Sequence, residues 1–259
     1  MGKKSVRFLV LLLFSLFLSS RSSAQDLTLL RQTAGYFNTN CYLLFDPRSR
    51  ETALIDVCGP LDSLQKSIRT ERLKLKYVLI THGHFDHVYG LREIRKRCPA
   101  VKVVMTMEEY RDMLAYYAKW EEIMSPQQVA GVKNRPDILA MLNPENAQWG
   151  RPDIVPEDGQ ILKLGRNKIT ALLSPGHAPG SVCYSAGNYL FTGDELQYRH
   201  VGHTDRALND SWNKQILSIR RLYSALPDTT IVCPGHGRFT DIGSEKRENK
   251  NIRADGENR

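Results

Sequence analysis

The chain has 259 residues, of which 41% are hydrophobic and 25% are charged, and its formal net charge is +8. This length suits one sizeable domain or two small ones, and the composition is that of a globular protein. Four basic and no acidic residues lie before residue 25, so the rest of the chain carries only about +4. No stripe of Arg and Lys with interleaved aromatic residues is visible, which excludes nucleic acid as the expected partner.

The first 24 residues have the pattern of an export signal. Three basic residues among the first seven precede an apolar run over residues 8–18, and Ser22-Ser23-Ala24 supplies small residues for cleavage. The run is too short to span a bilayer comfortably, which favours a signal peptide over residues 1–24; an uncleaved membrane anchor is the alternative. We expect the mature chain to start near Gln25, to be periplasmic or secreted, and to have no stable membrane insertion after cleavage.

Short strands and helices follow in the first half of the mature chain. Turn residues separate its apolar runs, and helical spacing of apolar residues occurs twice. The pattern predicts strands at 27–31, 41–45, 52–55, 76–81 and 101–105, and helices at 60–73 and 86–97.

Residues 107–150 differ in character and form a predicted helical insertion. Helices are expected at 107–124, 127–132 and 136–142, and the first is rich in Met and aromatic side chains. Two interpretations are open. The segment is either a helical layer packed on a sheet or a pocket wall over the functional site, since Met and aromatic residues suit an adaptable apolar pocket.

The strand pattern returns after residue 160. Strands are predicted at 161–164, 168–173, 181–185, 189–192 and 229–232, and a helix at 210–226. Both halves are thus rich in strands, which fits two sheets packed face to face with helices outside. We expect the domain to span residues 25–245 and to end in a flexible charged tail over 246–259.

Histidines and aspartates gather at the ends of strand-like runs. The segment His82-Gly83-His84-Phe85-Asp86-His87 directly follows one run, and His177, Asp194 and His236 each follow another in a Gly- or Pro-rich turn. Neutral imidazole and carboxylate suit zinc, and also iron or manganese. The pattern predicts a metal site at the edge of a sheet, to which several strands contribute ligands.

The number of ligands is generous for one metal ion and suitable for two. His82 and His84 lie on the same side of an extended segment, whereas Asp86 and His87 point differently because the chain turns into a helix. The cluster can therefore flank two ions more easily than it can wrap one. One later histidine is available for each ion, and Asp194 has two oxygens with which to bridge them.

The five cysteines leave at least one unpaired within the chain, and their spacing indicates no particular disulfide. Cys41, Cys183 and Cys233 lie in strand-like runs, where cysteine is commonly a small buried residue. Cys58 and Cys233 could also approach the metal centre, because each lies close in sequence to a candidate site residue.

Six segments together resemble the metallo-β-lactamase fold hydrolases over most of the mature chain. They are Asn40-Cys41-Tyr42, Ile55-Asp56, Thr81-His82-Gly83-His84-Phe85-Asp86-His87, Ser174-Pro175-Gly176-His177-Ala178-Pro179-Gly180-Ser181, Phe191-Thr192-Gly193-Asp194 and Pro234-Gly235-His236-Gly237. The resemblance implies an α+β fold, the αββα four-layer sandwich in which two mixed β-sheets pack face to face with helices outside.

The resemblance also implies which residues hold which of two divalent metal ions. One ion would be bound by His82, His84 and His177, the other by Asp86, His87 and His236, and Asp194 would bridge them. Asp56 would support the site from behind the ligands by fixing the orientation of an imidazole. Zinc is the expected metal, with iron or manganese as the alternatives.

The implied activity is hydrolysis of a small-molecule thioester, ester, lactone or lactam by a metal-bound hydroxide, with Asp86 and Asp194 as catalytic residues. An Asp at position 194 is similar to the glyoxalase II (hydroxyacylglutathione hydrolase) branch, whereas lactamase branches usually carry Cys or Ser there. The chain departs from that branch in having His203 where relatives often have Arg. From the length that follows residue 245, we also expect no counterpart of the helical C-terminal domain that binds glutathione in that branch.

Two other activities remain open within the same resemblance. One is that of a β-lactamase. The other is that of a mononuclear iron enzyme resembling the persulfide dioxygenases, which would use His82, His177 and Asp194.

Four residues are candidates for a substrate pocket. Tyr117 and Trp120 lie in the helical insertion, and Tyr198 and His203 follow Asp194. No oligomeric state is predicted.

Overall fold

The computed structural model describes residues 27–35, 37–59, 62–204 and 211–252, so the predicted signal peptide lies outside the described residues. In these ranges no helix combines the length and apolarity needed to cross a membrane. The strands are β1 Thr28–Ala34, β2 Thr39–Phe45, β3 Glu51–Ile55, β4 Lys74–Leu79, β5 Lys102–Val104, β6 Ile161–Leu164, β7 Asn167–Leu173, β8 Val182–Ala186, β9 Tyr189–Gly193, β10 Ile231–Pro234 and β11 Thr240–Asp241. The helices are α1 Asp62–Thr70, α2 Phe85–Val88, α3 Leu91–Arg97, α4 Met107–Ile123, α5 Pro126–Lys133, α6 Pro136–Met141, the 3-10 helix η1 Pro144–Ala147, α7 Trp212–Ala225 and α8 Ile242–Glu248.

The strands form two mixed sheets. The first has the order β1-β2-β3-β4-β5, antiparallel from β1 to β3 and parallel from β3 to β5. The second has the order β11-β10-β9-β8-β7-β6 and is antiparallel except for the parallel pair β9–β10. In the parallel parts, neighbouring strands end at the same edge, so the segments that follow β4, β9 and β10 can contribute side chains to one place.

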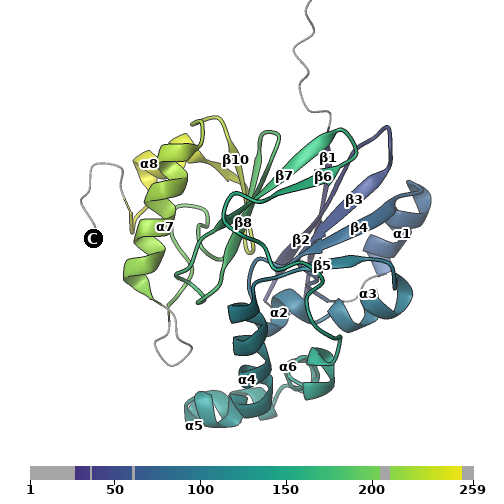
Figure 1. Ribbon diagram of the computed structural model, residues 1–259. Helices are drawn as coiled ribbons and strands as arrows, with labels where there is room; N and C mark the ends of the chain where they lie inside the picture. The colour runs from purple at the N-terminus through teal and green to yellow at the C-terminus, as the bar shows by residue number, and fades with distance from the viewer. Residues whose placement is uncertain (1–26, 36, 60–61, 205–210, 253–259) are drawn as a thin grey trace, which may run out of the picture.

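Three clusters of buried apolar side chains hold the sheets and helices together. Figure 1 shows α1 and α3 beside the first sheet and α7 and α8 beside the second. Alternating residues of β2 show how: Tyr42 and Leu44 pack between the sheets, whereas Leu43 packs on the opposite face with α1, α3 and α4. The outer face of the second sheet is covered by α7 and α8. This arrangement confirms the predicted four-layer αββα sandwich of two mixed sheets with helices outside.

Several element boundaries differ from those expected. The helix predicted over 86–97 is two helices, α2 and α3, with Gly90 as the N-cap of the second. Residues 246–252 of the predicted tail are not a free tail, because α8 continues to Glu248 and Ile252 is fully buried beside α7 and α8; the rest of the predicted tail lies outside the described residues. The short strand β11 and the 3-10 helix η1 had no predicted counterpart.

The helical insertion has two parts. Met113 and Tyr117 on α4, together with Trp149, belong to the core beneath the first sheet. Farther along α4, Trp120 instead packs with α5 and α6 in a separate apolar cluster. The first half of α4 is therefore a layer on the sheet, while the rest of the insertion forms a smaller unit beside it.

Candidate metal centre

The segments that follow four strands carry the predicted ligands to one place. His82 and His84 lie between β4 and α2, and Asp86 and His87 belong to α2 itself. His177 comes from the connection between β7 and β8, Asp194 directly follows β9, and His236 follows β10. Groups of three of these side chains place their potential ligand atoms within 4.8 Å of one another.

The first group consists of three histidine rings. The Nε2 atom of His82 lies 3.1 Å from Nδ1 of His84, and Nε2 of His177 lies 3.3 Å and 3.1 Å from those two atoms. Three nitrogens that bind one zinc ion tetrahedrally at 2.0–2.1 Å are separated by about 3.3–3.4 Å. The three rings therefore fit a single ion of this size.

The second group combines a carboxylate with two rings. The Nε2 atoms of His87 and His236 are 3.3 Å apart, and Oδ2 of Asp86 lies 3.6 Å and 3.4 Å from them. These separations also match the edges of a metal coordination polyhedron. The Thr39 hydroxyl donates to the same Asp86 oxygen at 2.6 Å and fixes the orientation of the carboxylate.

Asp194 reaches both groups. Its Oδ2 lies 3.3 Å from Nε2 of His236 and 3.9 Å from Nε2 of His177, and its Oδ1 lies 3.6 Å from Nε2 of His87. The Oδ1 atom is buried and has no hydrogen-bond partner within the described part of the chain. A buried carboxylate oxygen without a donor is costly unless a cation satisfies it, so this atom also fits a metal.

Asp56 lies behind the second group and orients it. Its Oδ2 accepts from Nδ1 of His87 at 2.8 Å and from the Thr81 hydroxyl at 2.7 Å, and its Oδ1 accepts from the Thr81 amide at 2.8 Å. The backbone of Asp56 is left-handed (φ 55°), an uncommon conformation for a residue other than glycine. Because Nδ1 of His87 donates to Asp56, its Nε2 lone pair is available to a metal.

Backbone carbonyl groups orient two further ligands in the same way. Nδ1 of His177 donates to the His203 carbonyl at 2.7 Å, and Nδ1 of His236 donates to the Phe37 carbonyl at 3.0 Å. Both rings consequently present Nε2 to the centre, which is the tautomer that a metal ligand requires.

The electrostatics of the two groups differ. Burial, and then the neighbouring His177, lowers the pKa of His84 to about 3, and burial also lowers the pKa of His82 and His177. Burial would lower the pKa of His87 as well, but the carboxylates of Asp86 and Asp56 raise it to about 9. The first group is therefore neutral and ready to bind a cation, whereas the second group binds protons when no metal is present.

An Asp56→Asn substitution should weaken the second group while keeping its shape. The amide retains one acceptor oxygen but places an NH₂ group where an acceptor is needed, so His87 loses its fixed orientation. We expect about 10- to 100-fold weaker zinc binding at the second group, as is typical for such outer partners. Competition with a chromogenic chelator measures this, with the exposed Asp158→Asn as the matched control; equal zinc affinities for the two variants would contradict the assigned role.

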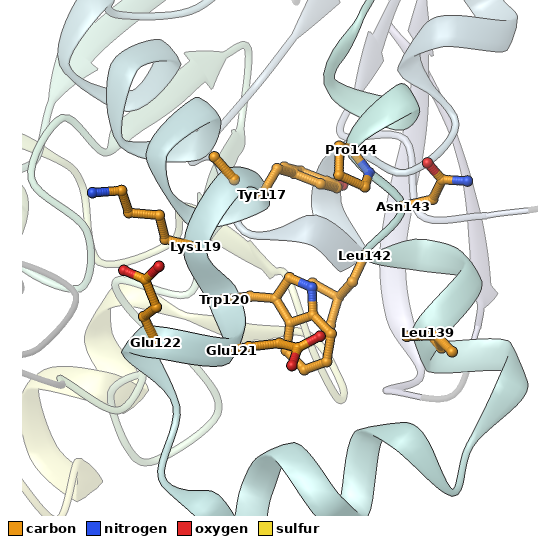
Figure 2. Close-up of a pocket in the computed structure, with 10 residues that line it drawn as sticks. Tyr117, Lys119, Trp120, Glu121, Glu122, Leu139, Leu142, Asn143 and Pro144 are labelled. Carbon is orange, nitrogen blue, oxygen red and sulfur yellow. The ribbon is translucent and has the colours of Figure 1, made fainter.

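The four candidate pocket residues do not come together. Tyr117 and Trp120 line a cavity of about 550 Å³ between α4 and the segment around Leu142, and Figure 2 shows both side chains on its wall. Tyr198 instead packs against the Arg238 guanidinium, which lies 3.7 Å from its ring centroid. The side chain of His203 is exposed, and the carbonyl group of this residue contacts the centre through His177.

The expected burial of three cysteines is confirmed, because Cys41, Cys183 and Cys233 are at most 1% exposed. Cys58 is buried as well, and all are free thiols. No cysteine belongs to the ligand groups of the described residues, so the structure does not place Cys58 or Cys233 as a ligand.

Sequence reasoning missed the buried polar residues that hold the ligand loops. Besides Thr39, these include two glutamates: Glu195 accepts from the His177 amide at 2.8 Å, and Glu109 accepts from the amides of Gly83 and Gly180. Burial raises the pKa of Glu195 well above its ordinary value and that of Glu109 to about 7. Glu195 directly follows Asp194, which was a usable signal, whereas the only motif around Glu109 is the Thr106-x-x-Glu109 spacing of a helix cap, which does not indicate a metal centre.

Comparison with known proteins agrees with this geometry. Residues 34–236 match the family model of the metallo-beta-lactamase superfamily. The chain belongs to this superfamily. It is 33% identical to the hydroxyacylglutathione hydrolase GloC of Haemophilus influenzae over 82% of this chain and 92% of the relative. It is also 26% identical to a probable metallo-hydrolase, YqgX, of Bacillus subtilis over 85% of this chain and 94% of that protein.

Solved structures of the superfamily share the fold. A B3 metallo-β-lactamase, BLEG-1, superposes with a TM-score of 0.67 at 26% identity, covering 86% of this chain and 98% of that one. TTHA1623 in a di-iron-bound form superposes with a TM-score of 0.65 at 26% identity, covering 85% and 98%. The identity to the hydroxyacylglutathione hydrolase GloC, together with this shared fold, confirms the expected likeness to glyoxalase II-like hydrolases.

Proposed function

We propose that this superfamily member is a dinuclear metal-dependent hydrolase of small thioesters, with glyoxalase II-like chemistry. The observation that carries the proposal is the position of Asp194, whose two oxygens face both ligand groups at once. A single carboxylate between two complete groups is the arrangement that holds two ions close together.

Each residue of the centre would have one of three roles: to hold the first ion, to hold the second, or to contact both. His82, His84 and His177 would hold one ion, Asp86, His87 and His236 the other, and Asp194 would bridge them. Bound divalent zinc, or iron or manganese, would supply Lewis acidity and lower the pKa of a water molecule to near neutrality. Asp86 and Asp194 would be the carboxylates available to orient that water or to accept its proton at a carboxylate oxygen.

A thioester is the first choice of substrate because of the named relatives. The hydroxyacylglutathione hydrolase of Haemophilus influenzae is 33% identical and matches this chain over 92% of its own length. The relative therefore corresponds to nearly the whole described domain, and its likeness does not depend on a further glutathione-binding domain. Esters, lactones and lactams are attacked by the same chemistry and are the next candidate substrate classes.

A hydrolysis screen with metal analysis tests the proposal. We expect the purified protein to hold two zinc-like ions per chain, to cleave an acyl-thioester such as a hydroxyacylglutathione, and to lose activity when a chelator removes the metal. Zinc should restore the activity. A metal-loaded protein that cleaves none of a panel of thioesters, esters, lactones and β-lactams would overturn it.

Two alternatives are separated by the same samples. The 26% identity to a B3 metallo-β-lactamase supports lactam cleavage, which the panel includes. A mononuclear iron oxidoreductase would use His82, His177 and Asp194 and would hold one iron and consume oxygen with a persulfide. The complete second group of Asp86, His87 and His236 favours two ions over one.

A further inference from the structure

Glu109 is a buried carboxylate that α4 presents to the metal centre. It lies in the first turn of the helix, whose N-cap is Thr106, and only 2% of its surface is exposed. The Thr106-x-x-Glu109 spacing is that of a capping box, in which the glutamate would accept from the N–H group of the cap residue. Here the glutamate has different partners, so its position calls for another explanation.

The two carboxylate oxygens of Glu109 bind two separate loops. Oε2 accepts from the Gly83 amide at 2.6 Å, and Oε1 accepts from the Gly180 amide at 2.6 Å. Gly83 lies between His82 and His84, and Gly180 lies three residues after His177. One side chain therefore links the two loops that carry all three histidines of the first group.

The contact between α4 and these loops leaves no room for adjustment. A Cβ atom on Gly180 would lie 2.3 Å from the Thr106 hydroxyl oxygen, and one on Gly83 would lie 3.0 Å from Cβ of Met113. The Thr106 hydroxyl also donates to the Gly180 carbonyl at 2.9 Å. Gly180 is thus held through its N–H and its C=O groups, and the helix fixes the loop in both directions along the peptide.

We propose that Glu109 is a positioning residue that sets the separation between the His82–His84 segment and the His177 loop, and thereby the affinity of the first group for its metal. The inference rests on the proposed two-metal function. It gives the first turn of α4 a role in the metal centre, although no residue of the helix belongs to a ligand group of the described residues. The second group has its own supports, Thr39 and Asp56, and is expected to be independent of Glu109.

The test is a Glu109→Gln variant in two single-site backgrounds. Glutamine keeps the length of the side chain but replaces one acceptor by an NH₂ group that faces an N–H donor. In a His236→Ala background, which retains the first group, we expect zinc affinity to fall about 10- to 100-fold. In a His84→Ala background, which retains the second group, zinc affinity should not change. The exposed Glu108→Gln is the matched control and should leave both affinities unaltered.

General destabilisation predicts a different result, because it would weaken zinc binding in both backgrounds. Equal losses in the two backgrounds, or no loss in either, would overturn the proposal. If Glu109→Gln does not fold, Glu109→Asp serves instead: it keeps the charge but is one methylene too short to reach both amides. A parent chain that binds no zinc would refute the proposed function itself, whereas a parent that binds two ions and an insensitive Glu109 variant would refute only this inference.

Discussion

Replacing Asp194 by alanine should abolish hydrolysis and remove metal from both groups. The wild-type carboxylate places Oδ1 3.6 Å from Nε2 of His87 in the second group and Oδ2 3.9 Å from Nε2 of His177 in the first group. Removing a ligand should cost at least the roughly 100-fold in affinity that the loss of an outer partner can cause. Because both groups share Asp194, zinc bound per chain should fall from two towards zero after dialysis, and kcat/KM should fall by at least about 100-fold.

Two companion variants make this result interpretable. Asp194→Asn keeps the volume and one oxygen, so it should retain more metal than the alanine variant. Asp137→Ala removes an exposed carboxylate that pairs with Arg135 and should behave as wild type. Metal content is measured by elemental analysis, and folding by circular dichroism. Near-normal activity of Asp194→Ala would refute both the bridging role and the catalytic role of this residue.

The layers of the fold were predictable because the sequence pattern changes at each element. Strand runs bounded by Gly, Pro and Asp turns, such as the one that ends at Thr81, follow from local propensity and alternation. The break between α2 and α3 was missed because the apolar spacing of Val88, Leu91 and Ile94 continues across Gly90. Periodicity alone does not distinguish one helix from two short ones that cover the same core.

The ligands of the centre were predictable, but most of their supports were not. A histidine after a strand is visible in a sequence, whereas the contact of Thr39 with Asp86 joins residues 47 positions apart. His203 illustrates the limit most clearly. It was predicted as a pocket side chain, yet its carbonyl is what holds His177. Every residue type has the same backbone carbonyl group, so the identity of the residue carries no signal for such a contact.

The sequence left two interpretations of the helical insertion open, a layer packed on a sheet and a pocket wall, and the structure supports the first of them for the start of α4. Phe85, inside the ligand motif, stacks on Tyr116 of α4 with ring centroids 6.2 Å apart and planes 6° from parallel. This contact and the hydrogen bonds of Glu109 to the Gly83 and Gly180 amides make α4, as far as Tyr116, part of the support of the centre. The part of α4 from Tyr117 onward, which includes the kink at Lys119, borders the cavity that Trp120 also lines. We therefore expect substrate discrimination by the insertion to come from the residues that line this cavity.

Acidification should release the metal of the second group before that of the first. Only neutral imidazole binds a metal, so a group that is protonated in the metal-free protein must expel protons on binding. Burial would lower the pKa of His236, but hydrogen bonds with Asp194 and Asp86 raise it to about 11, and that of His87 is raised to about 9. Both values lie above neutrality, so zinc affinity at the second group should fall as the pH falls.

In the first group, the pKa values of the imidazoles are lowered instead of raised. The pKa of His84 is lowered to about 3, and those of His82 and His177 are lowered by burial, so protons do not compete with the metal at neutral pH. With at least one proton expelled, zinc affinity at the second group should drop at least about tenfold per pH unit, or at least about 100-fold from pH 8 to pH 6, while that of the first stays nearly constant. Zinc titrations of the His84→Ala and His236→Ala variants at both pH values measure the two slopes separately. Equal slopes would show that the carboxylates around His87 and His236 do not hold protons there, and that the two groups share one electrostatic environment.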